Sequence, residues 1–157
     1  HQVENKENWR QEPQKGKTQL EYNRRYYQEI LDVVKAYKDY SILGHLDVIK
    51  RYDLNGEIEL EKIKDLIEQI FEVVIADGKG IEINTSNHRY GLSDMTPSRD
   101  ILKLYKELGG TIITIGSDSH KKEHLGAYID WAKEELRKLG YTQFCTFEKM
   151  QPIFHEL

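Results

Sequence analysis

Apolar and polar positions follow two different periods along this chain. In four segments, apolar residues recur every three or four positions, which predicts helices with one buried side. Four shorter segments are rich in β-branched and aromatic residues, which favour strands. The helices are expected at residues 19–37, 59–76, 97–108 and 123–139, and the strands at residues 40–45, 80–84, 111–115 and 141–147.

The order of these elements is one helix, three strand–helix units and a last strand. Strands that alternate with helices favour a parallel sheet with right-handed crossovers. The predicted fold class is therefore α/β, built from parallel strand–helix units. Four strands are too few to close a barrel, which needs about eight. The sheet is then either an open, doubly wound one or the second half of a barrel.

Local signals mark where three of the helices begin and which side they bury. Thr18 is expected to cap the first helix. Thr96 and Pro97 suit the N-cap and the first position of the third helix. Leu125 and Tyr128 are among the apolar residues that the pattern turns inward in the fourth helix.

The segment Gly116–His120 carries the clearest candidate chemistry. It follows the strand at 111–115, and two residues separate Asp118 from His120, so both side chains are expected on the same side of an extended chain. A carboxylate and an imidazole suit a metal site with mixed oxygen and nitrogen ligands. A capping Asp beside a surface His is an equally good interpretation of this pair alone. His45, at the end of the strand at 40–45, adds a second imidazole.

Two loops that follow strands carry arginines. Arg51 lies in the loop at 49–57, and Arg89 lies in the polar loop after the strand at 80–84. Taken alone, Arg51 reads as a solvated surface residue. Because the carboxyl ends of parallel strands meet at one edge of a sheet, these loops and the ligand candidates are expected on one face. Asp47 is predicted either to orient an imidazole or to cap a turn.

Composition narrows the classes of function. The net charge is −4 and the isoelectric point is near 5.9, which argues against binding to nucleic acid through a basic surface. Cys145 is the only cysteine, so the chain has no disulfide framework and no cysteine-based zinc site. The chain contains no run of about 18 apolar residues, so no membrane span is expected. These features favour a cytoplasmic protein.

The chain starts with His1 rather than Met, and residues 1–18 are polar and weakly patterned. Such a segment is typical of a long loop. We therefore expect that part of a larger protein precedes it. A processed terminus or the remnant of a tag is the alternative.

Three motifs, taken together and in this order, resemble a known family. They are Gly44-His45-Leu46-Asp47-Val48-Ile49-Lys50-Arg51-Tyr52, then Glu82-Ile83-Asn84-Thr85-Ser86 with Arg89, then Gly116-Ser117-Asp118-Ser119-His120. The chain resembles the histidinol-phosphatase branch of the polymerase-and-histidinol-phosphatase (PHP) superfamily over nearly its whole length. The amino-terminal His-x-His motif of that family does not occur in the 157 residues.

The resemblance implies a distorted seven-stranded (β/α) barrel that holds up to three divalent metal ions, with Zn, Mn or Fe all compatible with its ligands. It implies that residues 1–157 are one PHP-type metallophosphatase domain fragment that lacks the amino-terminal half of the barrel. The matched positions are His45, Asp118, His120 and His1 as metal ligands, and Arg51 and Arg89 as groups that bind the substrate phosphate.

The function implied by the resemblance is metal-assisted hydrolysis of a small phosphate monoester, L-histidinol phosphate, to L-histidinol and phosphate. Alternatives are another phosphoesterase of the superfamily, a metallohydrolase that cleaves C–N bonds, and an inactive fragment that acts only in assembly. A half barrel exposes apolar sheet edges, so the chain is expected to pair with another copy or with the missing half.

Overall fold

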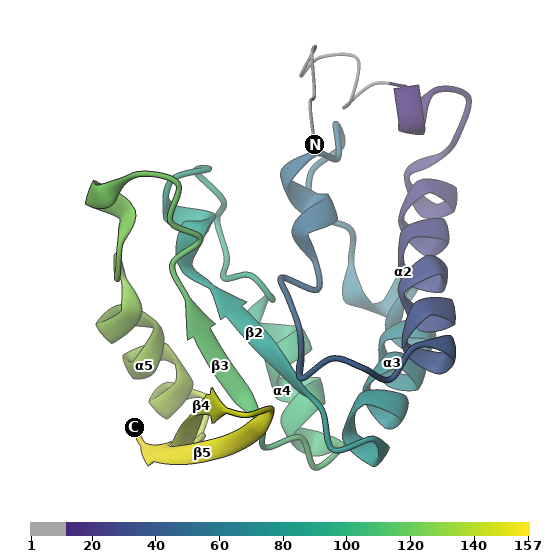
Figure 1. Ribbon diagram of the computed structural model, residues 1–157. Coiled ribbons are helices and arrows are strands. Elements are labelled where there is room, and N and C mark those ends of the chain that lie inside the picture. The colour runs from purple at the N-terminus through teal and green to yellow at the C-terminus, as the bar shows by residue number, and fades with distance from the viewer. Residues whose placement is uncertain (1–11) are drawn as a thin grey trace.

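The computed structural model describes residues 12–157 and consists of helices packed around a short sheet (Figure 1). Its helices are α2 (Gln19–Ala36), α3 (Lys64–Ala76), α4 (Arg99–Glu107) and α5 (Ile129–Lys138), with short 3₁₀ turns between some of the elements. Its strands are β1 (Ile42–Leu43), β2 (Gly80–Asn84), β3 (Ile113–Gly116), β4 (Gln143–Glu148) and β5 (Gln151–Glu156). Within residues 12–157, every helix is too short or too polar to span a bilayer.

Three strands form a parallel sheet in the order β1-β2-β3. The register pairs Leu43 with Ile81 at one edge and Ile83 with Ile115 at the other. Helix α3 connects β1 to β2, and α4 connects β2 to β3, so each connection is a strand–helix–strand crossover (Figure 1). The prediction of an α/β fold built from parallel strand–helix units is confirmed.

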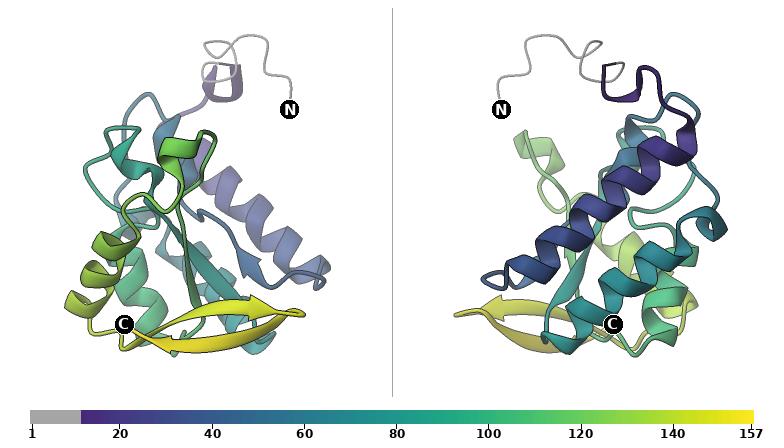
Figure 2. Two further views of the ribbon diagram at one scale, coloured as in Figure 1. Left: turned by 60° about the vertical axis from the view of Figure 1, so that its left-hand side comes forward. Right: turned by 90° about the vertical axis from the view of Figure 1, so that its right-hand side faces the viewer.

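The two faces of this sheet differ in character. Ile81 and Ile83 have no exposed surface and belong to a hydrophobic core with residues of α3 and α4, such as Phe71 and Tyr105, whose rings lie 4.9 Å apart. We call this side the outer face. Glu82 alternates with these isoleucines and lies on the opposite side, which we call the inner face. Helices α2 and α3 lie side by side on the outer side of the molecule (Figure 2).

The two outer strands of this sheet, β1 and β3, are only partly buried. Both residues of β1 are half-buried, and in β3 only Ile113 is fully buried. The reason is that helices cover the outer face alone. Within the described part of the chain, no element closes over the inner face (Figure 2).

The beginning of α2 follows its local sequence signal. Thr18 accepts a hydrogen bond from the main-chain N–H of Glu21, and the Glu21 carboxylate accepts one from the N–H of Thr18. This reciprocal capping box satisfies two main-chain donors at the helix start. The predicted cap at Thr18 is confirmed.

The predicted start of α4 at Thr96 and Pro97 is wrong. The helix begins two residues later, with Ser98 as its N-cap and Arg99 as its first residue. Thr96 is instead fully buried, and its carbonyl oxygen accepts a hydrogen bond from the main-chain N–H of Asn84 at 2.8 Å. That long-range bond extends the end of β2 and keeps residue 96 out of the helix.

The helix predicted at 123–139 starts six residues late. A 3₁₀ turn covers Lys122–His124, and α5 begins only at Ile129. Gly126 and Tyr128 both have positive φ, which a right-handed helix cannot accommodate. Leu125, predicted to face inward, is 81% exposed, and Tyr128 is 49% exposed. The helix predicted at 59–76 likewise starts as a 3₁₀ turn and becomes α3 at Lys64.

The fourth predicted strand exists, but it does not extend the parallel sheet. β4 pairs antiparallel with β5 in a separate two-stranded sheet, from Gln143 opposite Glu156 to Glu148 opposite Gln151. Lys149 and Met150, both with positive φ, make the two-residue turn that this hairpin needs. The sequence interpretation missed β5 because it treated the segment after 147 as a tail.

Candidate functional site

The carboxyl ends of β1, β2 and β3 bring the candidate residues to one end of the sheet. His45 follows β1, the 3₁₀ turn Thr85–His88 follows β2, and Asp118 follows β3. His45 and Asp118 both have positive φ, at 28° and 51°. Few non-glycine residues adopt this conformation, and those that do concentrate at functional sites.

Asp118 and His120 do converge, although Asp118 has a left-handed backbone and not the extended one that the prediction assumed. The Nε2 atom of His120 lies 3.0 Å from Oδ1 of Asp118. Asp118 is largely shielded, with 23% of its side chain exposed, whereas 74% of the His120 side chain is exposed. The pair thus presents one oxygen donor and one nitrogen donor toward solvent.

Arg89 braces the loop that carries this pair. Its Nη1 donates to the carbonyl oxygen of Ser117 at 2.9 Å, and its Nη2 donates to the carbonyl oxygen of Asp118 at 2.7 Å. The same Nη2 lies 3.9 Å from the Asp118 carboxylate. A positive guanidinium group is therefore fixed directly beside the candidate ligand.

Arg51 approaches the same carboxylate from β1, with its Nη1 3.9 Å from Oδ2 of Asp118. Its Nη2 donates to Oγ of Ser86 at 2.6 Å, and its guanidinium carbon lies 3.6 Å from the centre of the Tyr90 ring. Only 6% of its side chain is exposed. Arg51 is thus a buried, oriented cation, so the interpretation of it as a solvated surface residue is wrong.

Arg51 also retains unused donor capacity. Its Nε is buried and has no hydrogen-bond partner among the described residues. Arginine forks bind phosphate and carboxylate groups through paired donors. Both arginines lie 3.9 Å from the Asp118 carboxylate, so they concentrate positive charge at this end of the sheet, which suits an anionic ligand.

Sequence interpretation missed Glu82, the acidic residue of the inner face. Its Oε2 accepts a hydrogen bond from the main-chain N–H of His45 at 3.1 Å and lies 3.4 Å from Nδ2 of Asn84. Its Oε1 reaches the backbone of Gly116 on the other neighbouring strand. One side chain thus bridges the ends of all three parallel strands.

The described residues supply only part of a metal-binding set. Asp118 and His120 suit a divalent ion that accepts oxygen and nitrogen ligands. Within residues 12–157, however, no three His, Cys, Asp or Glu side chains lie close enough together to hold a metal ion. His45 is at the same end of the sheet but is not part of such a group. His1, the fourth predicted ligand, lies outside the described residues.

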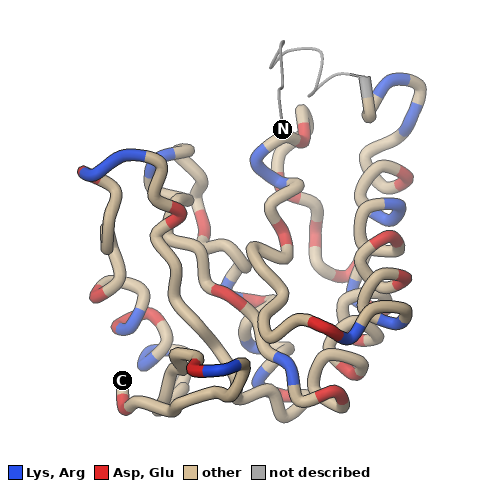
Figure 3. The backbone as a smooth tube through the Cα atoms, viewed as in Figure 1, with Lys and Arg blue, Asp and Glu red and all other residues tan. Residues whose placement is uncertain are grey.

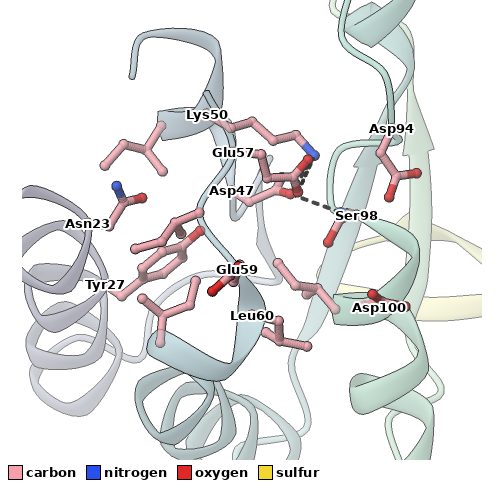
Figure 4. A pocket seen from close by; sticks show the side chains of 14 residues that line it. Asn23, Tyr27, Asp47, Lys50, Glu57, Glu59, Leu60, Asp94, Ser98 and Asp100 are labelled. Carbon is pink, nitrogen blue, oxygen red and sulfur yellow. Dashed lines mark hydrogen bonds and ion pairs between the residues drawn. The ribbon is translucent and has the colours of Figure 1, made fainter. Parts of the chain in front are cut away.

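Asp47 does not cap the turn that follows it, because its side chain makes no capping hydrogen bond there, and it contacts Ser98, the N-cap residue of α4, and Lys50 instead. Its Oδ2 accepts a hydrogen bond from the N–H of Ser98 at 2.9 Å and lies 2.8 Å from Nζ of Lys50 (Figure 4). Burial raises the pKa of Asp47, and the Lys50 ammonium opposes that effect. Glu57 completes this group at the wall of a cavity of about 200 Å³, which lies behind the site.

A set of aromatic contacts fixes the loop after β3. The His88 ring stacks on Tyr128 at 3.9 Å and meets the Trp131 ring edge-on at 4.3 Å. Burial lowers the pKa of His88, which favours the neutral ring in this stack. Oγ1 of Thr85 donates to the carbonyl oxygen of Ala127 at 2.6 Å. The turn after β2 therefore holds the loop that carries Asp118 and His120.

Charges are otherwise mixed over the molecule. Basic and acidic positions alternate along the helices and loops of the described chain (Figure 3). The concentration of positive charge beside Asp118 is therefore a local feature of the site and not part of a broad basic surface.

The PHP domain family matches residues 1–86, which is more than half of the chain and includes β1 and β2. The chain belongs to the PHP domain family. This confirms the resemblance that the three sequence motifs suggested. The carboxyl-terminal part, with Asp118 and His120, lies beyond the matched segment.

Curated relatives extend the similarity. A protein named probable histidinol-phosphatase from Thermotoga maritima is 34% identical over 122 residues, which make up 77% of this chain and 50% of that protein. Histidinol-phosphatase from Lactococcus lactis subsp. lactis is 31% identical over 137 residues, or 86% of this chain and 51% of that protein. The chain spans about half the length of the curated relatives it matches.

Solved structures give the same result for the fold. Histidinol phosphate phosphatase from Lactococcus lactis, in a complex with zinc, L-histidinol and phosphate, is 29% identical and has a TM-score of 0.77. The similarity covers 90% of this chain and 54% of that protein. A structure from Listeria monocytogenes, at 19% identity and a TM-score of 0.61, shares the fold.

Proposed function

We propose that this chain forms the phosphate-binding half of a metal-dependent phosphate-monoester hydrolase whose substrate is L-histidinol phosphate. The observation that carries this proposal is the pair of oriented arginines, Arg51 and Arg89, at 3.9 Å from the Asp118 carboxylate. Family membership and the zinc, L-histidinol and phosphate named for the Lactococcus structure support it.

Asp118, His120 and His45 are the described residues that would hold divalent metal ions, with His1 as a further ligand. Their oxygen and nitrogen donors are compatible with Zn, Mn or Fe. Bound divalent ions supply a water of lowered pKa and neutralise phosphoryl oxygens. In the complete barrel we expect up to three ions, with the remaining ligands on the amino-terminal half.

The arginines have two roles in this proposal. Their guanidinium groups bind the phosphoryl oxygens and stabilise the negative charge that spreads over them during hydrolysis. Their contacts with Ser86, Tyr90 and the main chain at Ser117 fix them before substrate arrives, so little conformational entropy is lost on binding.

The test is phosphate release from L-histidinol phosphate in the presence of Zn²⁺ or Mn²⁺. We expect that the double variant Arg51→Ala/Arg89→Ala loses turnover by about 100-fold or more, since each lost contact to a developing charge costs a few kcal/mol. Arg25→Ala is the matched control, because Arg25 forms an exposed pair with Glu29 on α2. If the double variant retains full turnover, the phosphate assignment fails and C–N bond hydrolysis becomes the better hypothesis.

A second candidate function is that the chain acts only in an assembly, paired with another copy or with the other half of the barrel. The observation in its favour is that residues 12–157 bring no three metal-binding side chains together. Light scattering tests pairing between copies, and a monomer of about 18.5 kDa at all concentrations would argue against it. Zinc-dependent turnover by the isolated chain would remove this candidate.

A further inference from the structure

The inner face of the sheet contains one acidic side chain to which the proposed function gives no role. Glu82 lies on the middle strand, near Gly44, which directly follows β1, and near Gly116, the last residue of β3. We propose that Glu82 is a positioning residue that holds the main chain of His45, and thereby its imidazole, in the orientation that a metal ion requires. This inference rests on the proposed function, in which His45 is a metal ligand.

His45 needs such support because its own surroundings do not fix it. The residue is exposed, and its φ of 28° is unfavourable for a side chain with a Cβ. Strain of this kind persists only where neighbouring groups impose it. Two main-chain hydrogen bonds do so: the N–H of His45 donates to Oε2 of Glu82, and its carbonyl oxygen accepts from Val48 at 2.9 Å.

Neither Gly44 nor Gly116 has a positive φ, so backbone conformation does not require glycine at either position. A Cβ at Gly116 would lie 2.3 Å from Oε1 of Glu82, which is impossible without moving the carboxylate. A Cβ at Gly44 would lie 3.6 Å from Oε2, which is an ordinary contact. The chain thus offers two glycine-to-alanine changes, of which only one displaces Glu82.

The carboxylate accepts the hydrogen bond from the His45 N–H at 3.1 Å, which is within the ordinary range for N–H···O bonds. Groups that orient a metal-binding histidine typically change metal affinity by about 10- to 100-fold when they are removed. Glu82 acts on the main chain of the ligand, whereas the usual partner acts on the second ring nitrogen.

The experiment measures two quantities in the ¹⁵N-labelled chain: the amide resonance of His45 without metal, and the affinity for Zn²⁺ by titration. We expect Glu82→Ala to move the His45 amide upfield and to weaken zinc binding by about 10-fold or more. Glu82→Gln retains an oxygen acceptor, so its His45 amide shift and its zinc affinity should both be close to those of the unchanged chain. Gly116→Ala should resemble Glu82→Ala, and Gly44→Ala should stay within about two-fold of the unchanged chain.

Each outcome decides the proposal. Unchanged zinc affinity in Glu82→Ala overturns it, whether or not the His45 amide moves. A loss that Glu82→Gln does not restore also overturns it, because Glu82 would then act through its charge. If Glu82→Ala does not fold, Gly116→Ala decides, since that change only displaces the end of a flexible side chain.

The same experiment distinguishes a failure of the proposed function from a failure of the role inferred for Glu82. If the unchanged chain takes up no Zn²⁺, the assignment of His45 as a metal ligand fails for this chain. The role of Glu82 is then decided by the His45 amide and ring resonances alone. If these are the same in Glu82→Ala and in the unchanged chain, Glu82 does not position His45.

Discussion

The outer and inner faces of β2 are built from alternate residues of one strand, yet they have opposite properties. On the outer face, Ile81 and Ile83 are completely buried against α3 and α4. On the inner face, Glu82 is only half-buried and bridges the ends of three strands. The comparison teaches that the outer face stabilises the fold, while the inner face and the adjoining strand ends carry the candidate functional residues.

The largest effect should come from the outer face. Ile83→Ala removes a side chain with no exposed surface from the hydrophobic core. We expect the free energy of unfolding to fall by about 2–5 kcal/mol, measured by urea denaturation. A loss below 1 kcal/mol would mean that the outer face is not the main source of stability.

The second-largest effect is a dependence of the free energy of unfolding on pH, and the group responsible is Glu135 on α5. The Lys138 ammonium and the Arg99 guanidinium hold the pKa of Glu135 below its ordinary value of 4.5. Nε of Arg99 lies 3.0 Å from one carboxylate oxygen of Glu135, and Nζ of Lys138 lies 2.7 Å from the other. Because the folded state favours the charged form, this stability is present above pH 4.5 and is lost as the pH falls through the lower pKa of the folded state.

The variant Glu135→Gln tests that dependence. Hydrogen bonds to charged groups contribute about 1.5–3 kcal/mol, so the variant should be less stable by about that amount at pH 7. At pH 3 the difference between the two proteins should be smaller than at pH 7, because the protonated fraction of Glu135 rises as the pH falls toward its lowered pKa. The measurement is thermal unfolding at both pH values. A difference of equal size at pH 3 and pH 7 would contradict the assignment.

A smaller effect concerns the orientation of Arg51 above the inner face. Tyr90→Ala removes the ring that stacks on its guanidinium carbon at 3.6 Å. Cation–π contacts of this kind contribute about 0.5–2 kcal/mol, so affinity for inorganic phosphate should fall by a factor of a few up to about 30. Titration calorimetry measures this. Tyr90→Phe, which keeps the ring, should bind as the unchanged chain does, and equal losses in both variants would exclude the ring as the cause.

The smallest effect should be found in the sheet on its inner face. Thr114 lies opposite Glu82 in the register and is half-buried. Since it is not part of the core, Thr114→Ala should change the free energy of unfolding by about 0.5 kcal/mol or less. The same urea experiment as for Ile83→Ala measures it. A loss as large as that of Ile83→Ala would remove the distinction between the two faces.

Sequence patterns were sufficient for the parts of the fold that depend on neighbours in the chain. The cap at Thr18 and the strand at 80–84 follow from local periodicity and capping chemistry. The start of α4 could not be predicted from local patterns, because the carbonyl oxygen of Thr96 accepts a hydrogen bond from the N–H of Asn84 on β2. The exposure of Leu125 could not be predicted either. It depends on the positive φ values of Gly126 and Tyr128, about which hydrophobic periodicity gives no information.

The candidate site shows the same division. The location of Asp118 and His120 follows from their place after β3, but their contact forms with Asp118 in a left-handed conformation and not in the extended chain that the prediction assumed. The anchoring of Arg51 by Ser86 does not, because these residues are 35 positions apart. Glu82 was overlooked because a polar residue that alternates with isoleucines is expected in any half-exposed strand. A usable signal existed: one glycine directly follows β1 and another ends β3, and both lie near this carboxylate.

The central claim is that the strand ends above the inner face bind a phosphate group between Arg51 and Arg89. The most direct measurement is a titration of the ¹⁵N-labelled chain with inorganic phosphate, followed through the amide and arginine side-chain resonances. The account predicts saturable shifts at residues 86–90 and 117–120 and at Nε of Arg51 and Arg89. No saturable shift at these positions, or shifts confined to α2, would contradict it.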